Sequence, residues 1–147
     1  KISLTKPASQ KYPGNGAFTL VNGVQNEKGL AASDEFLGFE GTDCEAVIDL
    51  GVLTDIKLIT AHVLDQRGGW IWPASGIGVM VSGDGKNFST SACNNPQTTI
   101  NGISCELQKP TKARFVKVNI KNHGPIAEGN PGSGNKAWLF VDEIEVN

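Results

Sequence analysis

The chain has 147 residues, enough for one domain with a substantial core, and its composition excludes several classes of protein. Hydrophobic residues make up 39% and charged residues 19%, which is typical neither of a disordered tail nor of a membrane protein. No apolar run approaches the roughly 20 residues that span a bilayer. The net charge of −2 and the scattered basic residues do not indicate a nucleic-acid-binding surface. We therefore expect a single domain over residues 1–147, and a start at Lys1 suggests a mature or excised fragment.

The N-terminal residues predict little regular structure. Residues 1–16 contain Pro7 and Pro13 and suggest an irregular lead-in, and residues 17–21 form a short apolar run. This run ends at Asn22-Gly23, a strong turn signal, and serves as the first strand of the expected fold.

The middle of the chain predicts several short strands. Residues 45–51 and 56–64 are expected as two separate strands, the second rich in β-branched side chains. Residues 77–82 and 87–90 suggest a hairpin around a glycine-rich turn, and residues 98–107 suggest another.

Two further strands are expected near the C-terminus, separated by a long loop over residues 121–136. Residues 114–120 alternate between apolar and polar side chains, so one face is expected to be buried. In the last strand, strict alternation would place Trp138, Phe140, Ile144 and Val146 on one face. The opposite face would then carry Leu139, Val141 and Glu143. Because a buried unpaired charge is costly, we expect a Lys, an Arg or a metal ion near Glu143.

Seven or eight short strands with turn signals between them predict an all-β fold, an antiparallel β-sandwich or jelly roll. Cys93 and Cys105 flank a polar, turn-rich segment and could face each other across a hairpin, although spacing alone does not establish a disulfide. Cys44 would then remain as a small buried hydrophobic residue. Two distant histidines do not supply the clustered ligands of a zinc site.

Five segments together resemble the coagulation factor C-type, or discoidin, domain, and in particular the family 32 carbohydrate-binding modules. They are Leu20-Val21-Asn22-Gly23, Ala46-Val47-Ile48-Asp49-Leu50-Gly51, Ser82-Gly83-Asp84-Gly85-Lys86-Asn87-Phe88, Ala113-Arg114-Phe115-Val116-Lys117-Val118 and Asp142-Glu143-Ile144-Glu145-Val146. The segments 12–23 and 136–140 look like the C-terminal modules of bacterial β-hexosaminidases (chitobiases), especially those of gut Bacteroidetes. The resemblance implies an eight-stranded jelly-roll sandwich, a structural Ca²⁺ ion and sugar-binding loops at one end. It also implies that Arg114 has a structural partner.

The resemblance also implies a set of calcium ligands. The ion would be held by the loop after the first strand and by a glutamate on the last strand. The corresponding oxygens belong to the backbone of Thr19 and Val24 and to the side chains of Asn22, Glu27 and Glu143. Asn22 stands where the family usually has Asp, which removes one negative charge, but Ca²⁺ accepts mixed side-chain and backbone oxygens. The alternative is that Glu143 pairs with a Lys or Arg and the loop is only a turn.

Trp70 and Trp72 are the strongest candidates for contact with sugar. If the segment is extended, both indoles point the same way, and an exposed indole can stack on the C–H face of a sugar. The alternative is that both rings fill one end of the core. Polar candidates lie nearby in the sequence: Asp65, Gln66 and Arg67, with His123 in the long C-terminal loop. His62 is a further candidate, but a core or edge histidine is the more expected role for it on a strand. A binding site is thus expected where the loops after His62, around Asn94 and after Ile120 meet.

An enzyme is not indicated. His62, Asp65 and Ser75 could be drawn as a catalytic triad, but the sequence has no nucleophile elbow. A sandwich of this size also rarely provides the paired carboxylates of a glycosidase cleft. We expect a non-catalytic module of a β-hexosaminidase-type glycoside hydrolase that binds galactose- or hexosamine-type sugars. It would be secreted, periplasmic or at the cell surface, and a monomer when isolated. The alternative is a structural domain that braces the catalytic domain and binds no sugar.

Overall fold

The computed structural model describes residues 1–99 and 101–147. In these residues, nine strands and three short 3₁₀ helices follow one another. They are β1 (Ile2–Leu4), β2 (Gly14–Ala17), η1 (Phe18–Val21), η2 (Gly29–Glu35), β3 (Leu37–Glu40), β4 (Cys44–Val63), η3 (Arg67–Gly69), β5 (Gly76–Ser82), β6 (Ser89–Ser91), β7 (Gln97–Thr99), β8 (Gly102–Lys121) and β9 (Trp138–Val146). In the described residues no helix has both the length and the apolar character needed to cross a membrane.

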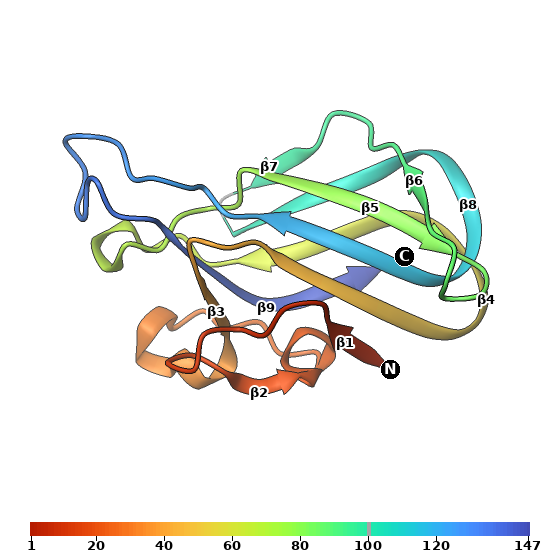
Figure 1. The fold of residues 1–147 in the computed structure, drawn as a ribbon, viewed down its shortest axis with the longest axis horizontal. Helices are drawn as coiled ribbons and strands as arrows, with labels where there is room; N and C mark the ends of the chain where they lie inside the picture. Colours follow the sequence, from red (N-terminus) through yellow and green to blue (C-terminus); the bar gives the residue numbers. More distant parts are fainter. Residues whose placement is uncertain (100) are drawn as a thin grey trace.

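Eight of these strands form an antiparallel sheet that folds into two layers, because β4 and β8 are long enough to belong to both (Figure 1). The first half of β4 pairs with β1 and with the second half of β8, which continues to β5 and β6. The second half of β4 pairs with β9 and with the first half of β8, and the outer strands of this layer are β3 and β7. Register shifts in the β4–β8 pairing, between Asp49 and Thr54 and between Ile56 and Leu58, accompany the bend.

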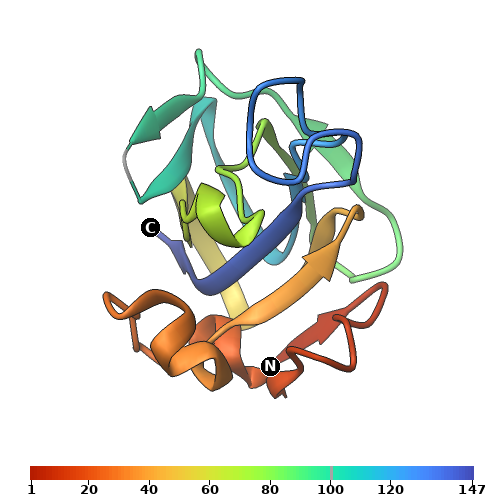
Figure 2. The ribbon, with the colours of Figure 1, turned by 90° about the vertical axis from the view of Figure 1, so that its left-hand side faces the viewer.

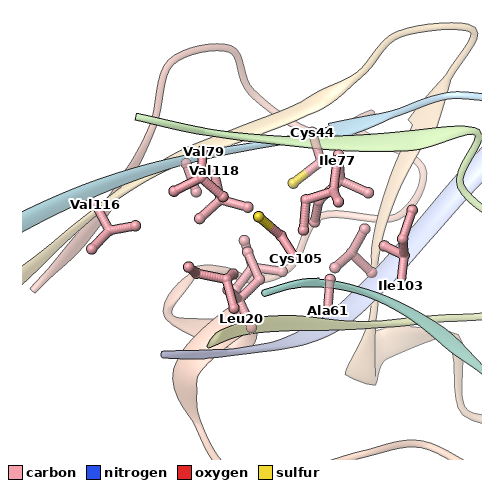
Figure 3. Packing of buried hydrophobic residues seen from close by; sticks show 14 of the residues in the cluster. Leu20, Cys44, Ala61, Ile77, Val79, Ile103, Cys105, Val116 and Val118 are labelled. Atoms are coloured by element: carbon pink, nitrogen blue, oxygen red, sulfur yellow. The ribbon is translucent and has the colours of Figure 1, made fainter. Parts of the chain in front are cut away.

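The core lies between the layers and is built by alternation along the strands. Val116, Val118 and Ile120 are fully buried, as the pattern in residues 114–120 predicts. Figure 3 shows side chains from both layers, such as Val79 and Ala61, turned into the same space. The predicted all-β sandwich is therefore confirmed, together with the β5–β6 and β7–β8 hairpins.

Several element predictions are wrong. The strands expected at 45–51 and 56–64 are one continuous strand, β4. The run 17–21 is mostly the 3₁₀ helix η1, from which only Leu20 enters the main core while Phe18 stays exposed. The lead-in 1–16 contains β1 and the start of β2.

The last strand also departs from strict alternation. The pairing of β9 with β4 shifts by one residue between His62 and Val63, and Asp142 is the extra residue. The bulge turns Ile144 into the same core as Leu139 and Val141, contrary to the expectation that it shares a face with Phe140. Val146 also packs against that main core.

Cys93 and Cys105 form a disulfide with their Cα atoms 5.1 Å apart, as the hairpin geometry allows. It ties the strand pair of β7 and β8 to the segment that follows β6. Cys44 is free and buried, and burial raises the pKa of its thiol to about 12, so it behaves as the expected small hydrophobic residue.

Reduction of the disulfide is expected to lower the free energy of unfolding by roughly 2–3 kcal/mol, because the 12-residue separation closes a loop in the unfolded chain. Urea unfolding with and without reductant measures the difference. In thiol titration of the unfolded, unreduced protein we expect one free thiol, that of Cys44. Three free thiols would contradict the pairing.

Arg114 has the structural partner that the resemblance implies. Its Nε and Nη2 donate to the two oxygens of Asp49 at 2.8 and 2.9 Å. These bonds, followed by the Gly51 N–H bond, lower the pKa of the Asp49 carboxyl from 3.8 to about 2.

Because the folded-state pKa of Asp49 lies below its unfolded value, its contribution to stability is present above about pH 4. It is lost as the pH falls from there toward about 2. We expect Asp49→Asn to flatten the acid side of a stability–pH profile within this window. Asp55→Asn is the control, because Asp55 is well exposed and its nearest oxygen lies 3.9 Å from Lys112. If wild type and Asp49→Asn lost equal amounts of stability between about pH 4 and pH 2, the prediction would be contradicted.

Candidate functional site

Two loops meet at one end of the sandwich, at the left of Figure 1 and facing the viewer in Figure 2. Residues 64–75 join β4 to β5, and residues 122–137 join β8 to β9. The backbone of Trp138 ties the start of β9 to the first loop. Its N–H donates to the carbonyl of Trp70 at 2.8 Å, and its carbonyl accepts the N–H of Trp72 at 3.1 Å. These are two of the three loops in which the sequence predicts a sugar site.

The segment from Gln66 to Ile71 is closed by its own backbone. Each of these two residues donates its N–H to the other's carbonyl, at 3.0 and 3.2 Å, and η3 lies between them. Trp70 follows η3 with a φ of 67°, a left-handed conformation that costs energy for a residue with a Cβ. The segment is thus a tight turn, so the condition under which Trp70 and Trp72 would point the same way, an extended backbone, is not met at Trp70.

The two tryptophans consequently have different surroundings. Trp70 is 39% exposed, whereas Trp72 is only 7% exposed and packs with Ile126 and Ala137. The indole of Trp70 lies against Gly132, where an added Cβ would come within 2.6 Å of the ring. Trp70 therefore supplies an aromatic surface with a rigid backing, while Trp72 supports this end of the fold from inside.

Polar side chains gather around Trp72. His123 stacks on its ring with centroids 4.2 Å apart, and the Arg67 guanidinium lies 4.3 Å from the ring centroid. Arg67 Nε also donates to Asp65 at 3.1 Å in a partly exposed ion pair. Among the described residues Trp72 Nε1 has no hydrogen-bond acceptor. The structure thus brings Asp65, Arg67, Trp72 and His123 into one contiguous group, and Trp70 lies on the same loop.

His62 and Asn94 are not part of this group. His62 Nδ1 lies 2.5 Å from an oxygen of Asp142. Asn94 bonds Glu106 of β8 through its backbone N–H at 2.7 Å. The predicted third loop therefore makes none of the described contacts with the other two.

Asp142 is a residue that sequence reasoning missed. It is fully buried, and its second oxygen accepts the N–H of Asn26 at 2.5 Å. Burial raises the pKa of the Asp142 carboxyl, while the bonds from Asn26 and His62 oppose that shift. The alternation of apolar and polar residues in β9 does not indicate that Asp142 is buried, because such a pattern does not reveal a bulge.

Asn122 is a second residue that the sequence did not reveal. Its side-chain amide donates to the carbonyls of Phe39, Thr42 and Ala137, at 3.3, 3.2 and 3.0 Å. Its oxygen accepts the N–H of Gly124 at 2.8 Å. One buried side chain thereby fixes both ends of the loop 122–137 against the β3–β4 turn.

Glu143 and the Asn22 loop meet as the resemblance implies. Glu143 is 7% exposed and accepts the N–H of Gly23 at 2.9 Å, while Asn22 Oδ1 accepts the N–H of Val24 at 2.9 Å. Within the described chain no Lys or Arg forms an ion pair with Glu143. Burial raises the pKa of the Glu143 carboxyl, and the negative charges of Glu145 and Asp142 raise it further.

This arrangement fits a Ca²⁺ ion in charge and in donor chemistry. A buried carboxylate without a Lys or Arg partner in the described chain lies against the Asn22 loop, which donates the N–H of Gly23 to it. The amide and carbonyl oxygens of such a loop are the type of ligand that calcium prefers. Glu27 is exposed, and Thr19 is buried with its hydroxyl accepting the N–H of Asn15. The described residues contain no group of three or more His, Cys, Asp or Glu side chains suited to a metal. Any ion here would therefore depend largely on backbone and amide oxygens.

Two surface hollows lie elsewhere and are lined by no aromatic side chains. One of about 390 Å³ lies beside Thr90 and Lys109, and one of about 450 Å³ lies beside Asp43 and Asn119. Without an aromatic face neither offers the stacking surface that a sugar ring uses. The loop end with Trp70 is the better candidate on chemistry, because it offers an exposed aromatic ring.

Comparison with known proteins identifies the fold through structure alone. No protein-family model matches, and no match is found among curated proteins. Solved structures do match. CpGH89CBM32-6 from Clostridium perfringens has a TM-score of 0.60 at 18% identity, over 100% of this chain and 91% of that one. The CBM32 of AlyQ, in complex with 4,5-unsaturated mannuronic acid, has a TM-score of 0.62 at 15% identity, over 100% and 93%.

The chain has the fold of these carbohydrate-binding modules. CpGH89CBM32-5 from C. perfringens, in complex with GalNAc-β-1,3-galactose, also matches, with a TM-score of 0.63 at 18% identity over 99% of this chain and 93% of that one. A GH29 fucosidase from Ruminococcus gnavus matches with a TM-score of 0.63 at 15% identity, over 99% of this chain but 24% of the fucosidase chain. The last match shows the same fold as one part of a much longer protein.

Proposed function

We propose that this chain is a non-catalytic carbohydrate-binding module whose site is the loop end around Trp70. The observation that carries the proposal is the exposed indole of Trp70, held on a closed turn of the loop whose Arg67, together with His123, packs on Trp72. The solved structures of the same fold support it, since several are carbohydrate-binding modules and two are in complex with saccharides.

The roles of the side chains follow from their surroundings. The exposed part of the Trp70 indole stacks on the C–H face of a sugar ring, and Gly132 beneath it keeps the indole from shifting. Asp65 accepts hydrogen bonds from sugar hydroxyls, while Arg67 and His123 donate to their oxygens. Trp72 acts from inside, by holding Arg67 and His123 in place. His62, bonded to Asp142, stabilises the fold and does not touch the ligand.

The module serves a larger enzyme by holding it on its glycan. We propose a β-hexosaminidase-type glycoside hydrolase as the parent and galactose or a hexosamine as the sugar. A weak single site then raises the local concentration of substrate for the catalytic domain. The disulfide supports an oxidising location, either secreted, periplasmic or at the cell surface.

A module that only braces the catalytic domain is the competing proposal. It is favoured by the buried state of Trp72 and by Val52 and Leu53, which are 68% and 60% exposed at the bend of β4. The exposed indole of Trp70 favours a sugar-binding module over a bracing one.

Trp70→Ala is expected to reduce the free energy of sugar binding by about 1–2 kcal/mol, because the stacking surface is lost. Wild-type affinity is expected on the order of 0.1–1 mM, about −4 to −5.5 kcal/mol, so the variant should fall below detection. Calorimetric or NMR titration with galactose, N-acetylgalactosamine and N-acetylglucosamine measures this.

Leu53→Ala is the control, since it removes an exposed apolar side chain at the bend of β4, outside the two loops of the proposed site. It should bind sugar as the wild type does. Undiminished binding by a folded Trp70→Ala variant would move the site elsewhere. No binding by the wild type to any glycan would favour the brace.

We also propose a structural Ca²⁺ ion at Glu143. Glu143 would supply the carboxylate, Asn22 a side-chain oxygen, and Thr19 and Val24 backbone carbonyls, with Glu27 as a further ligand from the same loop. The ion would neutralise a buried negative charge that has no Lys or Arg partner in the described chain. It would fix the loop against β9 and take no part in sugar chemistry.

Removal of calcium by a chelator is expected to lower the melting temperature. The loss corresponds to about 2.7 kcal/mol if free Ca²⁺ had been present at a hundred times its dissociation constant. Glu143→Gln should abolish this response, whereas Glu145→Gln, an exposed carboxylate on the same strand, should retain it. An unchanged melting temperature in chelator, with no ion found by elemental analysis, would refute the site.

A further inference from the structure

A polar hollow lies at the end of the sandwich opposite the proposed sugar site. Its volume is about 390 Å³, and it is lined by Thr90, Ser91, Ala92, Gln108, Lys109 and Thr111. Thr111 pairs with Ile56 next to the bend of β4, whereas the last residue of β8, Lys121, leads into the loop 122–137. Figure 1 shows β6 and the bend of β8 on the right, away from the two loops on the left. None of the side chains that line the hollow has a part in the sites described above.

The walls of this hollow are joined to each other. The backbone N–H of Gln108 donates to the carbonyl of Ala92 at 2.9 Å, and its side-chain amide donates to the carbonyl of Cys93 at 3.3 Å. The disulfide between Cys93 and Cys105 links the same two segments covalently. Because both walls are fixed, a ligand that enters the hollow orders little of the protein.

The side chains that line the hollow offer hydrogen-bond donors and one positive charge. Three hydroxyls, one amide and one ammonium belong to Thr90, Ser91, Thr111, Gln108 and Lys109, and none of these side chains carries a carboxylate. The Thr111 hydroxyl donates to the carbonyl of Lys109 at 2.9 Å and helps to hold the chain there. Among the described residues Lys109 forms no ion pair, so its charge is available to a ligand.

The strand segment around the hollow is also basic. Residues 107–117 contain four basic side chains and no acidic one, in a protein whose net charge is −2. Two of the four already have partners, since Arg114 is paired with Asp49 and the Lys112 ammonium lies 3.9 Å from Asp55. The hollow therefore lies in a locally positive part of a protein that is acidic overall, which favours an anionic ligand there.

Charge and size decide which anion suits the hollow. Oxyanions accept several hydrogen bonds and carry negative charge, as walls of donors with an ammonium require. A single ammonium balances the single charge of a sulfate ester better than the charge of about two that a phosphate monoester carries at neutral pH. The volume is many times the roughly 30 Å³ of one water molecule, so it leaves room for part of the molecule that bears the oxyanion.

We infer that this hollow binds the sulfate ester group of a sulfated sugar. The ammonium of Lys109 and the hydroxyls of Thr90 and Ser91 donate to the sulfate oxygens, and the sugar ring lies at the mouth of the hollow without an aromatic surface beneath it. The inference does not rest on the proposed function, because the hollow and the site at Trp70 lie at opposite ends of the sandwich and share no residue.

The first test compares galactose, galactose 6-sulfate and galactose 6-phosphate by NMR titration of the wild-type chain. We expect the backbone amide signals of Ser91 and Lys109 to shift with the 6-sulfate and not with galactose. The 6-phosphate should bind about threefold more weakly, because one exposed ammonium balances less of its charge. Added sodium chloride should weaken binding of the 6-sulfate, since salt screens an exposed ammonium.

The second test uses variants of the lining. Lys109→Met removes the charge and is expected to weaken binding of galactose 6-sulfate about tenfold, as the loss of a hydrogen bond to a charged group does. Lys112→Met is the matched control, because Lys112 lies on the same strand but does not line the hollow, and it should bind as the wild type does. Thr90→Val replaces a hydroxyl by a methyl group of similar shape and should weaken binding about threefold. Melting temperatures show whether each variant is folded.

Three results would overturn the inference. Undiminished binding by Lys109→Met, or an equal loss in Lys112→Met, would mean attraction to the basic segment in general. Equal or tighter binding of the 6-phosphate would overturn the assignment to sulfate. Unshifted Ser91 and Lys109 signals in galactose 6-sulfate would exclude binding in the hollow, whereas the indole signal of Trp70 in plain galactose reports separately on the proposed function. If Lys109→Met does not fold, undiminished binding by Thr90→Val has the same meaning.

Discussion

The buried carboxylate of Asp142 determines how the last strand joins the rest of the molecule. A charge with no exposed surface must be paired, and the structure pairs it with His62 of β4 and with the backbone of Asn26. These two bonds require an extra residue in β9 opposite β4, and the resulting bulge sets the register on both sides of it. The N-terminal loop is thereby attached to the sheet at the point where Glu143 meets Gly23.

The candidate sugar site depends on the other end of the same strand. Trp138 begins β9, and its backbone holds the turn of Trp70 and Trp72 as a short extension of the sheet. A binding residue on such a turn is more rigid than one on a free loop, which reduces the entropy lost when a ligand binds.

The sequence predicted the parts of the fold that follow simple periodicity. Alternation identified residues 114–120, because one face of that strand is buried and the other is not. A glycine-rich turn identified the β5–β6 hairpin. Alternation failed at Asp142, since a bulge places two consecutive residues opposite one and leaves no mark in the pattern of apolar residues. It failed also at Trp70, where a non-glycine residue with positive φ turns an apparently extended segment into a tight turn.

The long loops were unpredictable for a different reason. In β-strands the backbone N–H and C=O groups form hydrogen bonds with neighbouring strands, but residues 122–137 have few neighbouring strands. The side chain of Asn122 supplies hydrogen bonds to backbone groups at both ends of this loop instead. Asn26 does the same for the loop before β3, with its amide donating to the carbonyls of Gly29 and Ala32. In a sequence such residues look like ordinary polar loop positions, because the carbonyls that they contact are set by the tertiary fold.

The two tryptophans show how support and contact are divided within the site. Trp72 is buried under Arg67 and His123, so its ring fixes the positions of two polar side chains at the surface. Trp70 can then remain exposed without collapsing onto the core, because Gly132 supports it and the turn beneath it is closed. Exposing a large aromatic ring gains nothing for stability. Its exposure on a strained turn at the meeting point of two loops is the geometry that the proposed contact with a ligand requires.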